Sequence, residues 1–157
     1  MIISESVPTM SDRWFAGSLV RILASAGDTG GQLGVFEQRA RRDFSPPMHV
    51  HHREDTALYV IDGSITAIIG DERREAHAGE LVWLPRDIPH TFRVDSDEAR
   101  LLELIAPGGF ESYHVDASDP APALSLPPAG EPDIARLNAE IVPYGAELVG
   151  PPLGRTD

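Results

Sequence analysis

The sequence contains no cysteine and no lysine, and each absence removes a class of chemistry. Without cysteine, the chain can form neither disulfides nor thiolate metal sites. Without lysine, it has no side-chain amine for Schiff-base catalysis, and all thirteen of its cationic residues are arginines. A metal site in this chain therefore depends on histidine or oxygen ligands.

Long hydrophobic runs and a secretory signal are also missing. No apolar run reaches the length of about eighteen residues that a membrane-spanning helix needs. Residues 1–12 lack a basic segment followed by an apolar stretch, so we expect a cytoplasmic protein. The net charge of −12 would repel nucleic acid. We therefore expect neither a membrane nor a nucleic acid as a partner.

A chain of 157 residues corresponds to about one domain with a single core. Between Leu19 and Ile105, short apolar segments alternate with turn residues, a pattern typical of an all-β sandwich or barrel. Within this region, Asp62-Gly63 predicts a two-residue hairpin turn. The predicted strands are Leu19–Ala24, Leu33–Arg39, Ala57–Ile61, Ile65–Ile69, Arg73–Ala76, Leu81–Leu84, His90–Val94 and Arg100–Ile105.

The C-terminal part of the chain has a different composition. The segment 117–132 is rich in proline and has no periodicity, which predicts an extended linker over the surface. Glu131-Pro132-Asp133 predicts the start of a helix that runs to about Val142. This helix would cap the barrel or a dimer partner with one apolar stripe, formed by Ile134, Leu137 and Ile141.

Three histidines form the most informative pattern in the sequence. His49 and His51 are separated by one residue, so on a strand their side chains point to the same face. His90 follows a Gly-x5-Pro turn that begins at Gly79, at the start of another predicted strand. If the two strands are neighbours, the three imidazoles can close a metal site with three nitrogen ligands.

These residues resemble the cupin family, whose first motif reads Gly-x5-His-x-His-x(3 or 4)-Glu-x6-Gly. The second motif of the family reads Gly-x5-Pro-x-Gly-x2-His-x3-Asn. The chain follows both frames over about residues 33–110, with His49, His51 and Gly63 in the first motif and Gly79, Pro85 and His90 in the second. It departs from them at Asp43 and Asp87, which replace glycines, and at Val94, which replaces the asparagine.

The most important departure is Thr56, which stands where the first motif has its glutamate. We consider three ways in which the chain replaces that carboxylate. The Thr56 hydroxyl could hydrogen-bond a metal-bound water, which is the alternative that we favour. Asp55 could become a ligand after a local bulge. Glu103 could reach in from a neighbouring strand, although an acid on the solvent face of that strand is the simpler interpretation.

Other polar and aromatic residues near the motifs suggest simpler roles. We expect His52 and His77 to be on the surface, and we assign no role to His114. Arg53 and Glu54 are expected to form surface ion pairs. The aromatic residues that could line a pocket, most of them as part of the core, are Phe36, Tyr59, Trp83 and Phe92.

The resemblance implies an all-β cupin jelly-roll, a sandwich or barrel with a C-terminal α-helix. We expect an N-terminal arm over 1–16, a cupin barrel over 17–110 and a proline-rich extension with a helix over 111–157. Pro46-Pro47-x-His49-x-His51 and Pro107-Gly-Gly-Phe110-Glu are similar to small bacterial cupins that resemble quercetin dioxygenases. Such relatives bind one divalent metal ion per chain and are often homodimers, so we expect both here.

The metal implied by the resemblance is iron, nickel, manganese, cobalt or zinc. It would be held by His49, His51 and His90, with Thr56, Asp55 and Glu103 as candidate catalytic residues. The expected function is that of a metal-dependent oxygenase or dioxygenase acting on an aromatic or enolisable small molecule. Two alternatives stay open: a non-oxidative isomerase, cyclase or decarboxylase, and a non-catalytic protein that binds a small molecule.

Overall fold

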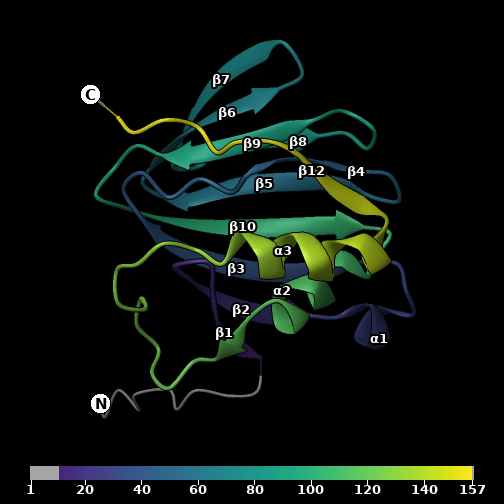
Figure 1. Ribbon diagram of the computed structural model, residues 1–157. Coiled ribbons are helices and arrows are strands. Elements are labelled where there is room, and N and C mark those ends of the chain that lie inside the picture. Colours follow the sequence, from purple (N-terminus) through teal and green to yellow (C-terminus); the bar gives the residue numbers. More distant parts are fainter. Residues whose placement is uncertain (1–10, 157) are drawn as a thin grey trace.

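The computed structural model describes residues 11–156, which form two antiparallel β-sheets packed face to face (Figure 1). One sheet has seven strands, in the order β11 (Asp119–Pro120), β1 (Asp12–Phe15), β2 (Ser18–Ala24), β3 (Gly34–Arg41), β10 (Glu98–Ala106), β5 (Asp55–Asp62) and β8 (Leu81–Leu84). The other has five, in the order β12 (Ala146–Gly150), β4 (Met48–His51), β9 (His90–Val94), β6 (Ser64–Ile69) and β7 (Glu72–His77). The all-β jelly-roll with a C-terminal helix is confirmed.

All eight predicted strands are present, with ends that differ from the prediction by at most two residues. The hairpin predicted at Asp62-Gly63 is wrong, because β5 and β6 belong to different sheets and the turn is a corner between them. Gly63 has a φ of 87°, and a Cβ atom at this position would come within 2.6 Å of the Glu98 carbonyl oxygen. Only glycine fits this corner, since both its conformation and its surroundings exclude a side chain.

The two aspartates that replace motif glycines keep the backbone conformation of glycine. Asp43 has a φ of 68° and Asp87 a φ of 66°. Aspartate tolerates this left-handed region better than most residues. The Asp43 carboxylate also accepts hydrogen bonds from the backbone N–H and the hydroxyl of Thr156. The turns of both motifs are therefore preserved although their glycines are not.

The segments outside the expected barrel add strands to both sheets. β1 lies within the expected N-terminal arm and pairs with β2 and β11, while residues 1–10 of that arm lie outside the described residues. β12 pairs with β4, the strand that carries His49 and His51. The extension also holds two short helical turns after β10, the 3₁₀ turn Phe110–Ser112 and α2 (Tyr113–Asp116).

The predicted C-terminal helix is confirmed as α3 (Ile134–Ile141), followed by a 3₁₀ turn over Val142–Tyr144. The Asp133 carboxylate caps its first turn by accepting a hydrogen bond from the backbone N–H of Arg136. Leu137 and Ile141 are buried as predicted, but Ile134 is 44% exposed. Helical side chains tilt toward the N-terminus, so the side chain of this first residue points off the end of the helix.

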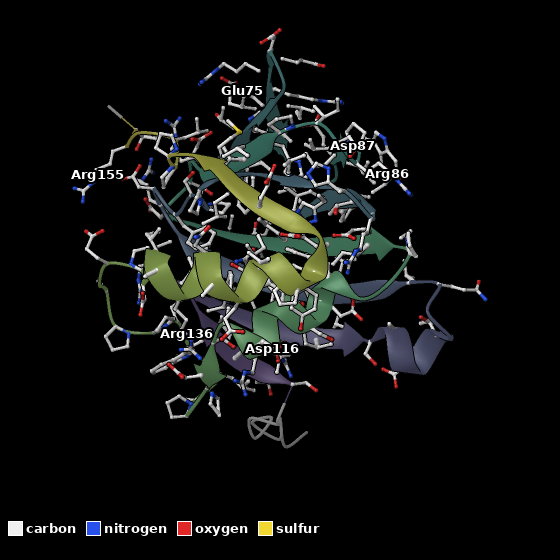
Figure 2. All side chains as sticks on the ribbon, turned by 45° about the vertical axis from the view of Figure 1, so that its right-hand side comes forward. Glu75, Arg86, Asp87, Asp116, Arg136 and Arg155 are labelled. Carbon is white, nitrogen blue, oxygen red and sulfur yellow. The ribbon has the colours of Figure 1, made fainter. Side chains whose placement is uncertain are left out.

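Arg136 fastens α3 to the preceding segment. Its guanidinium group donates to the carbonyl oxygens of Ser118 and Asp116, and Figure 2 shows Arg136 and Asp116 close together below α3. On the opposite side, α3 covers a core cluster that includes Phe15, Phe36 and Ile105. The extension is thus an integral layer of the fold. Within residues 11–156, no helix is both long and apolar enough to span a membrane.

Candidate metal centre

The three histidines of the two motifs lie together on the five-stranded sheet. His49 on β4 is directly opposite His90 on the neighbouring strand β9. His51 is two residues further along β4, so it faces the same side as His49. One ring nitrogen from each of the three histidines lies within 4.8 Å of the others. The predicted juxtaposition of the two motifs is therefore present.

Hydrogen bonds at Nδ1 fix which nitrogen of each ring faces the centre. Nδ1 of His49 donates to the Pro47 carbonyl oxygen at 2.6 Å, and Nδ1 of His90 donates to the Ile88 carbonyl oxygen at 3.0 Å. Nδ1 of His51 lies 2.7 Å from a carboxylate oxygen of Glu54. Protons on the three Nδ1 atoms leave the Nε2 lone pairs free, which is how metal-binding histidines are usually held.

Glu54 therefore has a different position from the one expected for it. Glu54 is 4% exposed and its side chain contacts the buried ring of His51, so the prediction of a surface ion pair is wrong. The bend after β4 turns Glu54 back toward the barrel. His52, in contrast, points outward as expected, and its Nδ1 pairs with the Asp87 carboxylate at 2.6 Å. His77 is likewise on the surface.

Burial keeps His49 and His90 in the neutral form that binds metals. Desolvation, together with the neighbouring imidazoles of His90 and His51, holds the pKa of His49 well below its usual value of 6.5. For His90, burial and the nearby His51 lower the pKa to about 4. Neutral imidazole is the form that coordinates a cation, so no proton competes with a metal ion for these two residues near neutrality.

The structure places Asp55 outside this centre. Its two carboxylate oxygens accept hydrogen bonds from the backbone and the guanidinium group of Arg86, and this pairing lowers the pKa of Asp55. Figure 2 shows Arg86 beside Asp87 at the turn between β8 and β9, on the outside of the barrel. Because the Asp55 side chain points away from Thr56 and toward Arg86, we remove it from the candidate ligands.

Thr56 and Glu103 face the histidines from the seven-stranded sheet. Thr56 is buried on β5 and lines the same cavity as the triad. Glu103 on β10 lies between Phe36 and Leu58 on the two neighbouring strands, and it also lines this cavity. The interpretation of Glu103 as a solvent-facing acid is therefore wrong. Burial raises the pKa of Glu103 to about 8.

His114, to which we assigned no role, also lines the cavity. It comes from α2 in the extension and is 6% exposed, and burial lowers its pKa to about 3. Its ring packs against Phe15 and Phe36, with centroid distances of 4.7 and 4.2 Å. No sequence signal marks it, because its burial depends on strands more than seventy residues away along the chain.

The remaining walls of the cavity are largely apolar. Two of the expected pocket aromatics are instead on the outer surface, with Trp83 52% and Tyr59 36% exposed. Within residues 11–156, no arginine lines the cavity. The aromatic and aliphatic side chains that do line it include Phe15, Phe44, Phe92, Phe110, Leu137 and Leu148. The site therefore combines a cluster of metal-type ligands with a surface suited to an apolar molecule.

Comparison with known proteins agrees with this geometry. A model of the cupin domain family matches residues 40–106, a stretch that contains all three histidines. The chain thus contains a cupin domain and resembles quercetin dioxygenase-like proteins. It is 26% identical over 110 residues to quercetin 2,3-dioxygenase of Bacillus subtilis (strain 168), covering 69% of this chain but only 33% of that relative.

A second relative and two solved structures extend the likeness. Protein SchB of Streptomyces halstedii is 28% identical over 109 residues, which cover 64% of this chain and 78% of that protein. KdgF from Halomonas sp. has a TM-score of 0.55 and 20% identity, covering 59% of this chain and 81% of its own. An RmlC-like cupin from Shewanella frigidimarina has a TM-score of 0.53 and 14% identity, and the match covers 67% of this chain and 86% of that cupin. At such identities the structural likeness shows the fold alone.

Proposed function

We propose that this protein binds one divalent metal ion per chain through His49, His51 and His90 and catalyses the oxidation of a small molecule by dioxygen. The substrate is a mainly apolar compound that is aromatic or enolisable. The observation that carries this proposal is the convergence of one ring nitrogen from each of these histidines on a largely apolar cavity. The likeness of the cupin domain to a quercetin 2,3-dioxygenase supports the oxygenase assignment.

The donor set fits a catalytic metal ion. Three protein ligands with a further open position are typical of catalytic sites, and imidazole suits zinc, iron, nickel and copper alike. When bound, the ion would supply Lewis-acid activation and, for a redox metal, electron transfer. The chain supplies the orientation, because the acceptors at Pro47, Glu54 and Ile88 hold each ring with its Nε2 toward the cavity.

The groups considered for proton transfer are Thr56 and Glu103, two side chains of the seven-stranded sheet. A threonine hydroxyl is too weak a base to take a proton from a substrate, so Thr56 acts as a hydrogen-bonding group beside the triad. Glu103 is a carboxyl group in the same cavity, and with a pKa of about 8 it can exchange a proton near neutrality. We therefore assign to Glu103 the exchange of a proton with a polar group of the substrate.

The same observation favours a second candidate function. A carboxyl group that keeps its proton near pH 7 can donate that proton to a carbonyl substrate. This arrangement would suit a non-oxidative isomerase, cyclase or decarboxylase that uses the metal ion as a Lewis acid. A third candidate, a protein that binds a small molecule without converting it, requires only the apolar cavity.

Oxygen uptake separates these candidates. Protein loaded separately with iron, nickel, manganese or cobalt is incubated with a flavonol and with other enolisable aromatic compounds, and dissolved oxygen is recorded. The proposal predicts uptake that a His90→Ala variant loses. Conversion of a compound without oxygen uptake would contradict it in favour of the second function, and binding without conversion would favour the third. Oxygenase activity that arises only in a Thr56→Glu variant would also contradict it.

A further inference from the structure

The ring of His114 occupies an apolar position at the cost of an unsatisfied polar atom. It contacts the rings of Phe15, Phe36 and Phe110, with centroid distances between 4.2 and 5.5 Å. Within residues 11–156, its Nδ1 is the one fully buried side-chain nitrogen or oxygen atom without a hydrogen-bond partner. Burying an unpaired polar atom is unfavourable, and a phenyl ring would fill the same space without this penalty.

Glu103, on the seven-stranded sheet, is a half-buried polar residue without a partner in the part of the chain that the structure describes. Its direct neighbours across the ladder, Phe36 and Leu58, are fully buried apolar residues. Among the described residues, it makes no hydrogen bond and no ion pair, whereas Gln38, another polar residue of the cavity wall, bonds to the Ser18 hydroxyl. Glu103 faces the cavity next to the Phe36 ring on which His114 packs.

Neither group belongs to the cluster of metal-type ligands. One ring nitrogen of His49, His51 and His90 converges within 4.8 Å, and that cluster includes neither His114 nor Glu103. The two come from separate elements, α2 in the extension and β10 in the seven-stranded sheet, and both line the cavity and neighbour Phe36. Polar groups that a fold leaves unpaired in an apolar cavity are suited to binding a polar group of a ligand.

We propose that His114 and Glu103 form a second polar binding point, which holds a polar group of the substrate while a different group faces the three histidines. This inference rests on the proposed function and narrows its substrate class. The substrate has an apolar, uncharged body. No arginine in the described part of the chain lines the cavity, so no cationic side chain there could balance a negative charge on the substrate. It carries two separate oxygen-containing groups, such as the hydroxyl or keto oxygens of an aromatic ring system.

The first test asks whether His114 stabilises the fold. Thermal unfolding is measured for metal-free wild type, His114→Phe and His114→Gln. If His114 is kept for binding, the phenyl ring removes an unsatisfied polar atom and raises Tm by about 2–4 °C. A Tm that falls in both variants would mean that His114 is a structural residue, and would overturn the proposal.

The second test measures binding directly in the zinc-loaded protein, since zinc is redox-inert. Calorimetric titrations compare phenol, which has one hydroxyl group, with resorcinol and hydroquinone, whose two hydroxyls are too far apart to chelate one ion. We expect the wild type to bind at least one of the two diols about tenfold more tightly than phenol, the value of one well-placed buried hydrogen bond. His114→Phe and Glu103→Leu should lose this preference, so that each binds the two diols no more tightly than phenol.

Two controls make the result specific. His77→Phe changes an exposed histidine and should keep the preference, and His114→Gln, which retains a polar group, should restore part of it. Zinc content is measured in every sample. A protein that binds zinc but treats phenol and both diols alike would overturn this inference alone. A protein that binds no zinc would overturn the proposed function and this inference with it.

Discussion

The two walls of the cavity differ in how completely their polar groups are satisfied. On the five-stranded sheet, each of the three histidines has its Nδ1 committed to an acceptor, so its other nitrogen is held in one direction. On the opposite wall, Glu103 and the Nδ1 of His114 have no partner among the described residues. The histidines of the first wall are therefore preorganised to bind a cation, whereas the second wall has polar groups that only a ligand can satisfy.

The difference teaches where each half of the proposed function resides. Orientation of metal ligands by outer hydrogen bonds is a feature of the folded chain itself and needs no substrate. A fully buried polar atom without a partner, such as the Nδ1 of His114, destabilises the free protein and is consistent with a role that appears on binding. Metal affinity should therefore depend on the first wall, and substrate preference on the second.

The largest effect is expected from removing a ligand on the first wall. Loss of a hydrogen bond that orients a metal ligand typically lowers metal affinity about 10–100-fold, and His49→Ala and His90→Ala, which remove the ligand itself, should lower it by more. The stability of the metal-free protein should change little in either variant. In the wild type, metal at about 100 times Kd should add about 2.7 kcal/mol to the free energy of unfolding. Thermal unfolding with and without metal checks both statements. If either metal-free variant is unfolded, the histidine is structural.

An intermediate effect is expected for the carboxylate behind His51. Glu54→Gln removes the charge that holds the His51 ring and should lower metal affinity about 10–100-fold, without removing the site. Competition with a chromogenic chelator measures this change. Glu80→Gln, which alters an exposed acid beside His77, is the matched control and should leave the affinity unchanged. Equal affinities for all three proteins would show that Glu54 does not orient the ligand.

A pH-dependent effect on stability is expected for Glu103 on the second wall. Burial raises the pKa of this carboxyl from 4.5 to about 8, so the folded chain keeps a proton that the unfolded chain releases. The free energy of unfolding of the metal-free protein should therefore fall, through this group, as the pH rises from about 4.5 to about 8. Glu103→Gln should remove that fall. Urea unfolding of both proteins at pH 5 and pH 8 provides the comparison, and identical pH dependence would contradict the burial of an unpaired carboxyl.

The smallest effect is expected outside the cavity. Asp55→Asn breaks the ion pair with Arg86, which lies at the surface, so Tm should change by no more than about 2 °C. Metal affinity should not change, because Asp55 points away from the three histidines. A loss of metal affinity similar to that of Glu54→Gln would return Asp55 to the ligand set.

The sequence predicted the first wall well. Alternation along a strand places His49 and His51 on one face, and the second motif places His90 at the start of a neighbouring strand. These are local rules, and they hold because the barrel positions both motifs through regular strand pairing. The substituted turns also follow a local rule, since Asp43 and Asp87 adopt the conformation of the glycines that they replace.

The same local rules could not predict which polar side chains are buried elsewhere around the site. The burial of His114 depends on Phe15 of β1 and Phe36 of β3, which pack against its ring and join distant parts of the chain. Glu54 follows the first motif in a charged run, and only the bend after β4 turns it inward. Period and spacing describe one segment at a time, so they do not reveal side chains that several segments bury together.

The most direct test of the account is the metal content of untagged protein purified without chelator, measured by elemental analysis beside His90→Ala. We predict close to one iron, nickel, manganese, cobalt or zinc ion per chain in the wild type and almost none in the variant. A wild-type protein that contains no metal and takes up none on titration would contradict the central claim that these three histidines form a metal centre.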